Sequence, residues 1–296
     1  MTAAAPFAAS RKTRMMYSLM SLGVATIAEA IAGIIAFYIV DVKNLPVTWY
    51  STFWFFYTIY NALNNPALGY LSDRTRSRWG RRIPYVLFGG LPYAVAFALI
   101  FTAPFDGKEN PVALLVYFGV MIVLWEGIYT ALATGYYGLL PEMFPSYEER
   151  TDVAAKMNIF QTVALVLGAA LPPLLSNLLG WSGMALLLAA ISTVAIYVSL
   201  PFLKERQDLR QEASFPFGKA LAATFLNRSY LTAAGAQAMR FFATGLLQMG
   251  ILFYLKYSLK EDESLATVIL GIAFIVAMIS LYPWRNWVAN KLDSRR

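Results

Sequence analysis

The chain has 296 residues, of which 58% are hydrophobic and only 14% are charged, and its mean hydropathy is +0.54. Soluble domains carry about 25% charged residues, so this deficit places the protein in a lipid bilayer. The sequence contains neither cysteine nor histidine. It therefore excludes disulfides, thiolate metal sites and imidazole-based catalysis, and we expect no enzyme activity, cofactor or metal.

The apolar residues fall into long stretches. A helix needs about 20 predominantly apolar residues to cross the hydrocarbon core, and eight stretches in this sequence meet that criterion. In chain order they are Tyr17–Val40, Val47–Leu71, Pro84–Ala103, Val112–Leu140, Val153–Leu179, Met184–Leu203, Ser229–Tyr257 and Leu265–Val288. The segment Ser214–Leu226 is expected to lie on the membrane surface as a short amphipathic helix.

The basic residues set the orientation. With eight spans, nineteen of the 24 Lys and Arg residues fall on one side of the membrane. Cytoplasmic loops are enriched in Lys and Arg, so we expect both termini in the cytoplasm and the protein in the plasma (inner) membrane. The net charge of +7 then reflects topology, and no nucleic-acid partner is expected.

The longest loop, Lys204–Phe215, separates six spans from two. We expect an N-terminal six-helix bundle over residues 1–203, a cytoplasmic loop with the amphipathic segment over 204–228, and the start of a second bundle over 229–296. The ends of spans two and eight, Gly69–Arg74 and Trp287–Asp293, are similar and are each followed by a pair of arginines. This echo suggests an internal repeat, in which four further spans would follow.

Three motifs carry a family resemblance. They are LSDRTRSRWGRR at Leu71–Arg82, NALNNP at Asn61–Pro66, and Leu140–Glu142 followed by Tyr147–Thr151. The sequence resembles the melibiose permease-like glycoside–pentoside–hexuronide:cation symporters of the major facilitator superfamily. The resemblance implies an all-α membrane protein of twelve helices in two bundles, with the substrate site between them. This chain would supply the complete first bundle and two helices of the second, truncated after the eighth helix.

The sequence departs from that family at its charged sites. The family's sodium-binding aspartates in the second helix correspond to Asn61 and Asn65, and its sugar-binding aspartates correspond to Ala25 and Ala133. Loss of two carboxylates weakens a site for a hard cation. We therefore expect the coupling ion to be a proton rather than sodium.

Ionisable residues inside the spans are the main functional candidates, because a charge at the bilayer centre costs at least about 2.5–3.5 kcal/mol. They are Glu29, Glu126 and Arg240. An acid in an apolar site binds protons more readily than in water, so either glutamate can load one. The cation-coupling candidates are Glu29, Glu126, Asn61 and Asn65. The substrate-binding candidates are Glu29, Glu126, Tyr129, Tyr137, Lys156, Arg240 and Asn64.

The arginine-rich loop after span two is expected to act as a gate. Its candidate residues are Asp73, Arg74, Arg78, Arg81 and Arg82. Arginine forms strong bidentate pairs with carboxylates, and the loop after span four faces the same side. The expected partners are Glu142, Glu148, Glu149 and Asp152.

The sequence thus predicts a secondary active transporter, a symporter of a sugar or similar small polar solute. Its partners would be that solute, a coupling proton and the lipid bilayer. Two alternatives stay open: an amphiphilic or lipid-like substrate, and a fragment that does not transport.

Overall fold

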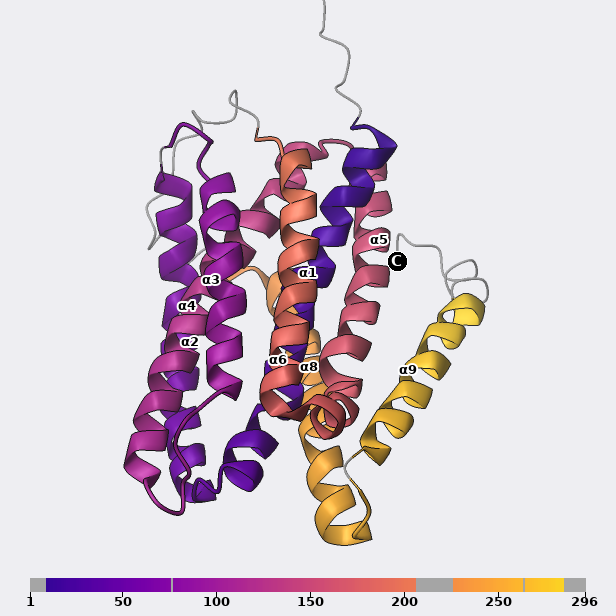
Figure 1. Cartoon of the computed structure of the whole chain (residues 1–296). Coiled ribbons are helices and arrows are strands. Elements are labelled where there is room, and N and C mark those ends of the chain that lie inside the picture. The colour runs from indigo at the N-terminus through magenta and orange to yellow at the C-terminus, as the bar shows by residue number, and fades with distance from the viewer. Residues whose placement is uncertain (1–8, 76, 206–225, 263, 285–296) are drawn as a thin grey trace, which may run out of the picture.

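The computed structural model describes residues 9–75, 77–205, 226–262 and 264–284, and every regular element in these ranges is a helix (Figure 1). The helices are α1 (Arg11–Phe37) with the π-helical turn η1 (Tyr38–Val42), α2 (Val47–Arg74), α3 (Ile83–Phe101), α4 (Pro111–Met143), α5 (Tyr147–Leu165) with the π-helical turn η2 (Val166–Ala170), α6 (Pro172–Ser199) with the 3-10 turn η3 (Leu200–Phe202), α8 (Arg228–Phe253) with the π-helical turn η5 (Tyr254–Leu259), and α9 (Leu265–Trp284).

By length and composition, six of the described helices can cross a membrane. The first of them, Arg11–Val42, has 32 residues and is therefore about 48 Å long, against about 30 Å of hydrocarbon. The others begin at Ile83, Pro111, Tyr147, Pro172 and Arg228. With 28 residues, α2 is also long enough, but its tyrosines and asparagines lower its hydropathy.

The border between the fifth and sixth spans differs in detail from the expectation. The fifth helix passes through η2 and continues as Pro172–Leu179, and the helical backbone breaks at Gly180, with φ 71° and ψ 167°. Glycine adopts this conformation without a steric penalty. The break lies between the predicted end at Leu179 and the predicted start at Met184, so hydropathy placed the border correctly although the helices nearly join.

Side chains at the helix starts explain where several helices begin. Ser10, Ser146 and Asn227 each cap a helix by accepting a hydrogen bond from a backbone N–H three residues later, at 3.1–3.2 Å. Such caps satisfy the donors that a first turn leaves unpaired. The acids Glu148 and Glu149 in the first turn of α5 also suit the positive end of the helix dipole.

Helix α1 lies at the centre of the packing, in contact with α5, α6, η2 and α8, while α3 and α2 both pack on α4. Small residues permit the closest approaches. A Cβ at Gly23 would lie 2.6 Å from the Ser192 carbonyl oxygen, and one at Gly90 would lie 3.0 Å from Ile196. Close backbone contact through small residues is a common way for helices to associate in membranes.

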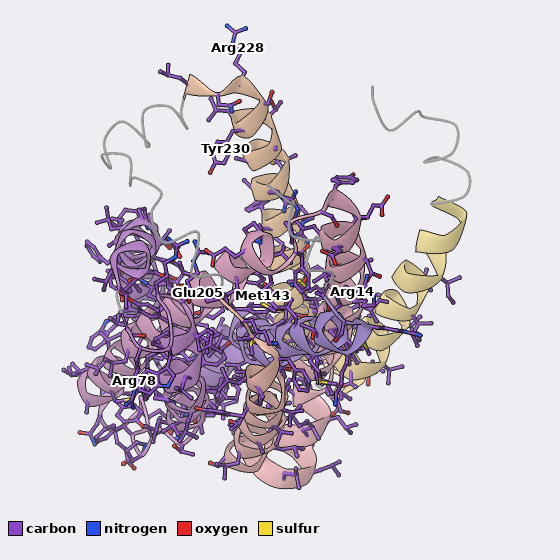
Figure 2. All side chains as sticks on the ribbon, turned by 90° about the horizontal axis from the view of Figure 1, so that it is seen from above. Arg14, Arg78, Met143, Glu205, Arg228 and Tyr230 are labelled. Atoms are coloured by element: carbon purple, nitrogen blue, oxygen red, sulfur yellow. The ribbon has the colours of Figure 1, made fainter. Side chains whose placement is uncertain are left out.

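The two ends of the bundle differ, and we name them by their charge. The basic end, where α1 begins and α2 ends, carries Arg14 and Arg78 (Figure 2), and η1 and η5 lie at the opposite end. Among the described side chains of α8 and η5, the buried ones are Leu252 and Leu255, toward the opposite end. Figure 2 shows its other end, at Arg228, projecting away from the remaining helices.

Two segments singled out in the sequence lie largely outside the residues that the structure describes. The segment Ser214–Leu226 lies outside the described residues except for its last residue, and the echo at Trp287–Asp293 lies wholly outside them.

Candidate functional site

The arginine-rich loop is held at the basic end by two buried carboxylates. Glu142 Oε1 lies 2.5 Å from Arg81 Nη2 and 3.3 Å from Arg82 Nε, and the Glu142 side chain is 6% exposed. Of the four acids expected to pair with this loop, Glu142 does so. Figure 2 labels its neighbour Met143 near the centre of this end.

The second carboxylate, Glu205, was missed by the sequence analysis. Its two oxygens accept hydrogen bonds from the backbone N–H of Arg81 at 2.8 and 2.9 Å, and one of them also accepts from the Arg82 N–H at 3.0 Å. Gly80 (φ 113°) lies so close that a Cβ would collide with this carboxylate. Glu205 follows the sixth span directly, and no local pattern indicates that it reaches the loop after the second.

The remaining arginine-loop residues are less fixed. Arg78 is exposed and its guanidinium carbon lies 4.0 Å from the centroid of the Trp79 ring. Asp73 and Arg74 form the last turn of α2, and their side chains lie outside the described part of the structure. The loop is therefore fixed mainly through Arg81, Arg82 and their backbone.

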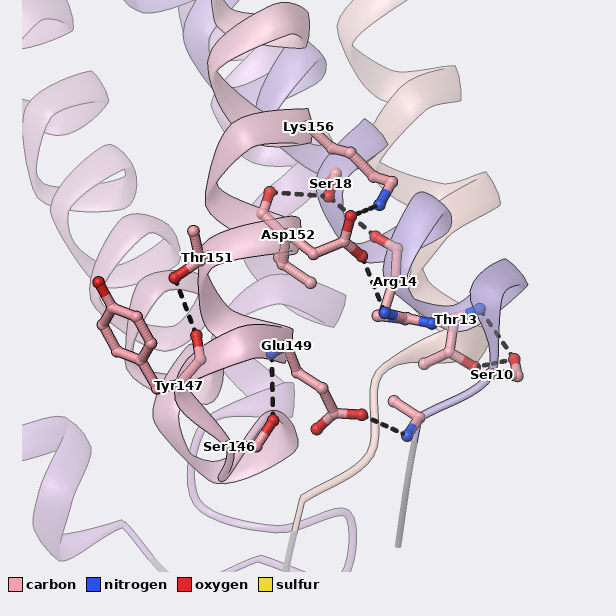
Figure 3. Close-up of polar contacts among 12 residues, drawn as sticks. Ser10, Thr13, Arg14, Ser18, Ser146, Tyr147, Glu149, Thr151, Asp152 and Lys156 are labelled. Atoms are coloured by element: carbon pink, nitrogen blue, oxygen red, sulfur yellow. Dashed lines mark hydrogen bonds and ion pairs between the residues drawn. The ribbon is translucent and has the colours of Figure 1, made fainter. Parts of the chain in front are cut away.

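A second polar cluster at the basic end joins α1 to α5 (Figure 3). Asp152 pairs with Arg14 at 2.9 Å and with Lys156 one turn along α5. Glu149 accepts a hydrogen bond from the Ala9 N–H at 3.0 Å. These acids, expected to contact the arginine loop, thus bind the start of the chain instead, because α5 packs along α1. Lys156 correspondingly lies among these charges at the basic end.

Deeper in the bundle, Glu126 of α4 forms a buried network with α2. The residue is 4% exposed, and both of its carboxylate oxygens accept hydrogen bonds: Oε2 from the Tyr57 hydroxyl at 2.7 Å and Oε1 from the Thr130 hydroxyl at 3.1 Å. Both donors are uncharged. A buried carboxylate is costly unless it is hydrogen-bonded or neutralised, and these two hydrogen bonds stabilise Glu126 between α2 and α4.

The asparagines of α2 continue the network. Asn64 Nδ2 donates to Thr130 Oγ1 at 3.0 Å, and the Thr130 hydroxyl lies 3.5 Å from Asn65 Oδ1. Asn65 Nδ2 in turn donates to Asn61 Oδ1 at 2.7 Å. Asn61 and Asn65 are one turn apart and therefore share a face of α2, and Asn64 pairs α2 with α4.

The other acid, Glu29, lies on α1 near two tyrosines of α4. It is half-buried where α1 crosses η2, and it interacts electrostatically with the hydroxyls of Tyr129 and Tyr137. Tyr129 stacks on Trp125 with ring centroids 5.4 Å apart and planes at 3°. Tyr137 is 38% exposed, and its hydroxyl accepts from Gln161 of α5 at 3.4 Å. This region combines a carboxylate, hydroxyls and flat aromatic rings.

Arg240 is placed differently from the glutamates. It is exposed on α8, its Nε donates to Gln237 at 3.0 Å, and its guanidinium carbon lies 4.5 Å from the centroid of the Phe241 ring. Among its described contacts, none is with an acid of the first bundle. The structure thus gathers the candidates on α1, α2 and α4, and it places Lys156 at the basic end and Arg240 apart on α8.

At the opposite end, a contact missed by the sequence analysis ties α1 to α8. Asp41, with its side chain 7% exposed, pairs with Lys256 and accepts a hydrogen bond from the Tyr257 hydroxyl. Beside it, the rings of Phe37 and Phe253 meet edge to face with centroids 5.6 Å apart. These residues stand at the ends of predicted spans one and seven, where spacing alone does not reveal a partner.

A family comparison agrees with this architecture. The sequence model described as MFS/sugar transport protein matches residues 16–292. The chain belongs to this family. The all-α fold and the membrane location expected from the sequence are thereby confirmed, and the family consists of transport proteins rather than enzymes.

Curated relatives give the same picture. The chain is 24% identical over 284 residues to the isoprimeverose transporter of Lactiplantibacillus pentosus. The aligned region covers 92% of this chain and 58% of the relative. It is 32% identical over 152 residues to an uncharacterized symporter of Synechocystis, covering 50% and 27%. A putative glycoside/cation symporter of Escherichia coli is 22% identical, covering 85% and 56%. The chain thus spans little more than half of such relatives at most.

Proposed function

We propose that the complete protein is a symporter that carries a sugar or glycoside into the cell together with a proton. Relatives named as isoprimeverose transporter, glycoside/cation symporter and lactose permease support the substrate class. The setting of Glu126 supports the proton: it is a buried carboxylate whose hydrogen-bond donors, Tyr57 and Thr130, are both neutral.

The two intramembrane acids then have separate roles. Glu126, between α2 and α4, carries the proton. Glu29 lies within electrostatic range of Tyr129 and Tyr137. It accepts hydrogen bonds from sugar hydroxyls while the exposed ring of Tyr137 stacks on the sugar's apolar face. Tyr129 interacts electrostatically with both acids, so substrate and proton sites adjoin. Arg240 contributes to the substrate site from the second bundle when the two bundles approach each other.

The arginine loop closes the basic end, which we place in the cytoplasm. Arg81 and Arg82, with Asp73, Arg74 and Arg78, then form a gate around Glu142 and Glu205. Residues 1–203 make the first bundle, 204–228 connect it, and 229–296 begin the second. Alternating access proceeds by rocking of the bundles around a midplane site, as in other transporters built from repeats.

Uptake by the full-length protein in proteoliposomes tests this function. With labelled isoprimeverose and lactose as first substrates, an inward proton gradient without sodium is expected to drive accumulation, and Glu126→Gln to abolish it. Glu148→Gln, at an exposed position at the start of α5, is the matched control and should transport normally. Accumulation that follows a sodium gradient at fixed pH, with normal transport by Glu126→Gln, would overturn proton coupling. Uptake of neither sugar, but of an amphiphile, would overturn the substrate class.

A further inference from the structure

The Thr130 hydroxyl has two acceptors within reach and a single hydrogen to donate. Glu126 Oε1 lies at 3.1 Å and Asn65 Oδ1 at 3.5 Å, while Asn64 Nδ2 donates to the same hydroxyl oxygen at 3.0 Å. A threonine hydroxyl offers one donor and two lone pairs. Its hydrogen therefore serves Glu126 or Asn65, and the shorter distance to Glu126 is the one expected for an ionised carboxylate.

Protonation of Glu126 reverses this choice. A proton from solvent bonds to Oε1, the carboxylate loses its negative charge, and no other covalent bond changes. The new O–H donates to Thr130 Oγ1, whose two lone pairs are then used by Glu126 and Asn64. The Thr130 hydrogen must turn to its other acceptor, Asn65 Oδ1, because a buried hydroxyl left without an acceptor is costly.

We propose that Thr130 is a positioning residue that transmits the protonation state of Glu126 to the asparagines of α2. The transmission runs from Glu126, which is 4% exposed, through Thr130, which is 2% exposed, to Asn65. Asn65 is exposed and hydrogen-bonded to Asn61. It thereby links a buried proton site to amides at the surface of the bundle. This inference rests on the proposed role of Glu126 as the proton carrier.

The other titratable groups within electrostatic range of Glu126 are tyrosines. They are Tyr57 and Tyr60 on α2, Tyr93 on α3 and Tyr129 on α4. Tyrosine hydroxyls ordinarily titrate near pH 10 and are neutral at physiological pH. The described ion pairs place no Lys or Arg against Glu126.

Infrared difference spectra of the full-length protein between alkaline and acidic buffer test the transmission without a sugar. With isotope-labelled asparagine, the wild type is expected to gain a protonated-carboxyl band, absent in Glu126→Gln, together with a shift of an asparagine amide carbonyl band. Thr130→Val should keep the carboxyl band and lose the amide shift, and Thr130→Ser should keep both. An amide shift that persists in Thr130→Val, or that is lost equally in Thr130→Ser, would overturn the proposal.

Two further measurements keep the test decisive. Asn65→Leu removes the far acceptor at an exposed position, so it must also lose the amide shift while the carboxyl band persists; a retained shift would overturn the proposal if Thr130→Val does not fold. For sugar binding, couplings of this kind change affinity by about 5–150-fold, and Thr130→Val should reduce the pH dependence that Thr130→Ser retains. Absence of sugar binding in the wild type would refute the proposed function and leave the spectral test standing.

Discussion

Replacement of Glu142 by glutamine is expected to destabilise the protein through the arginine-rich loop. The carboxylate lies 2.5 Å from Arg81 and 3.3 Å from Arg82 and is 6% exposed. Glutamine keeps the size and one acceptor oxygen but removes the charge, so two partly buried guanidinium groups lose their shared counter-ion. The loop then keeps Glu205 as its remaining described carboxylate partner.

The magnitude follows from the burial of the pair. Removing one partner of a buried ion pair costs about 3–5 kcal/mol, whereas an exposed pair contributes about 0–1 kcal/mol. Arg81 and Arg82 are 21% and 16% exposed, which places this site nearer the buried limit, and glutamine retains one hydrogen bond. We therefore expect a loss of about 2–3 kcal/mol in the free energy of unfolding.

Denaturant unfolding of the purified protein in detergent measures this loss, with hydrogen exchange at the Arg81 and Arg82 amides as a local readout. Glu148→Gln is the control, because it lies exposed in the first turn of α5, where the helix dipole contributes about 0.3–1 kcal/mol. A Glu142→Gln protein no less stable than the Glu148→Gln protein, with unchanged amide exchange, would refute the reasoning.

Two further predictions concern the opposite end of the bundle and the asparagines of α2. Asp41→Asn weakens the contact between α1 and α8, so it should slow the cross-linking, by a short bifunctional thiol reagent, of cysteines placed at Phe37 and Phe253, whose rings lie 5.6 Å apart. An unchanged rate would contradict this prediction, and these 296 residues contain no other cysteine that could react. Asn61→Asp with Asn65→Asp restores two carboxylates suited to a hard cation, so uptake at fixed pH should become sodium-dependent, and uptake that stays indifferent to sodium would count against a latent cation site.

Hydropathy and charge predicted most of the helical architecture, because each transmembrane helix must be about 20 apolar residues long. Even the break at Gly180 fell between two predicted spans. The motif of the arginine loop also led to Glu142, because the loops after spans two and four lie on the same side of the membrane and arginines there pair with nearby carboxylates. These features depend on local sequence and on membrane geometry.

The missing features depend on which helices touch. Glu205 reaches the loop from the end of α6, and Asp41 meets Lys256 from a helix over two hundred residues away. In the sequence, Tyr57 and Thr130 look like ordinary residues of apolar helices, and only the packing of α2 on α4 brings both to Glu126. Glu149 and Asp152 were expected at the arginine loop, but α5 packs along α1 and turns them toward Ala9 and Arg14. The periodicity of a sequence indicates which residues share a face of a helix, but it does not indicate which other helix packs against that face.

The most direct test of the central claim is to record proton movement during sugar entry. Full-length protein in unenergised proteoliposomes, lightly buffered and free of sodium, receives a pulse of sugar while a pH electrode follows the medium. The account predicts alkalinisation of the medium that accompanies sugar entry in the wild type and is absent in Glu126→Gln. Sugar entry with no pH change in the wild type, or the same alkalinisation in Glu126→Gln, would contradict it.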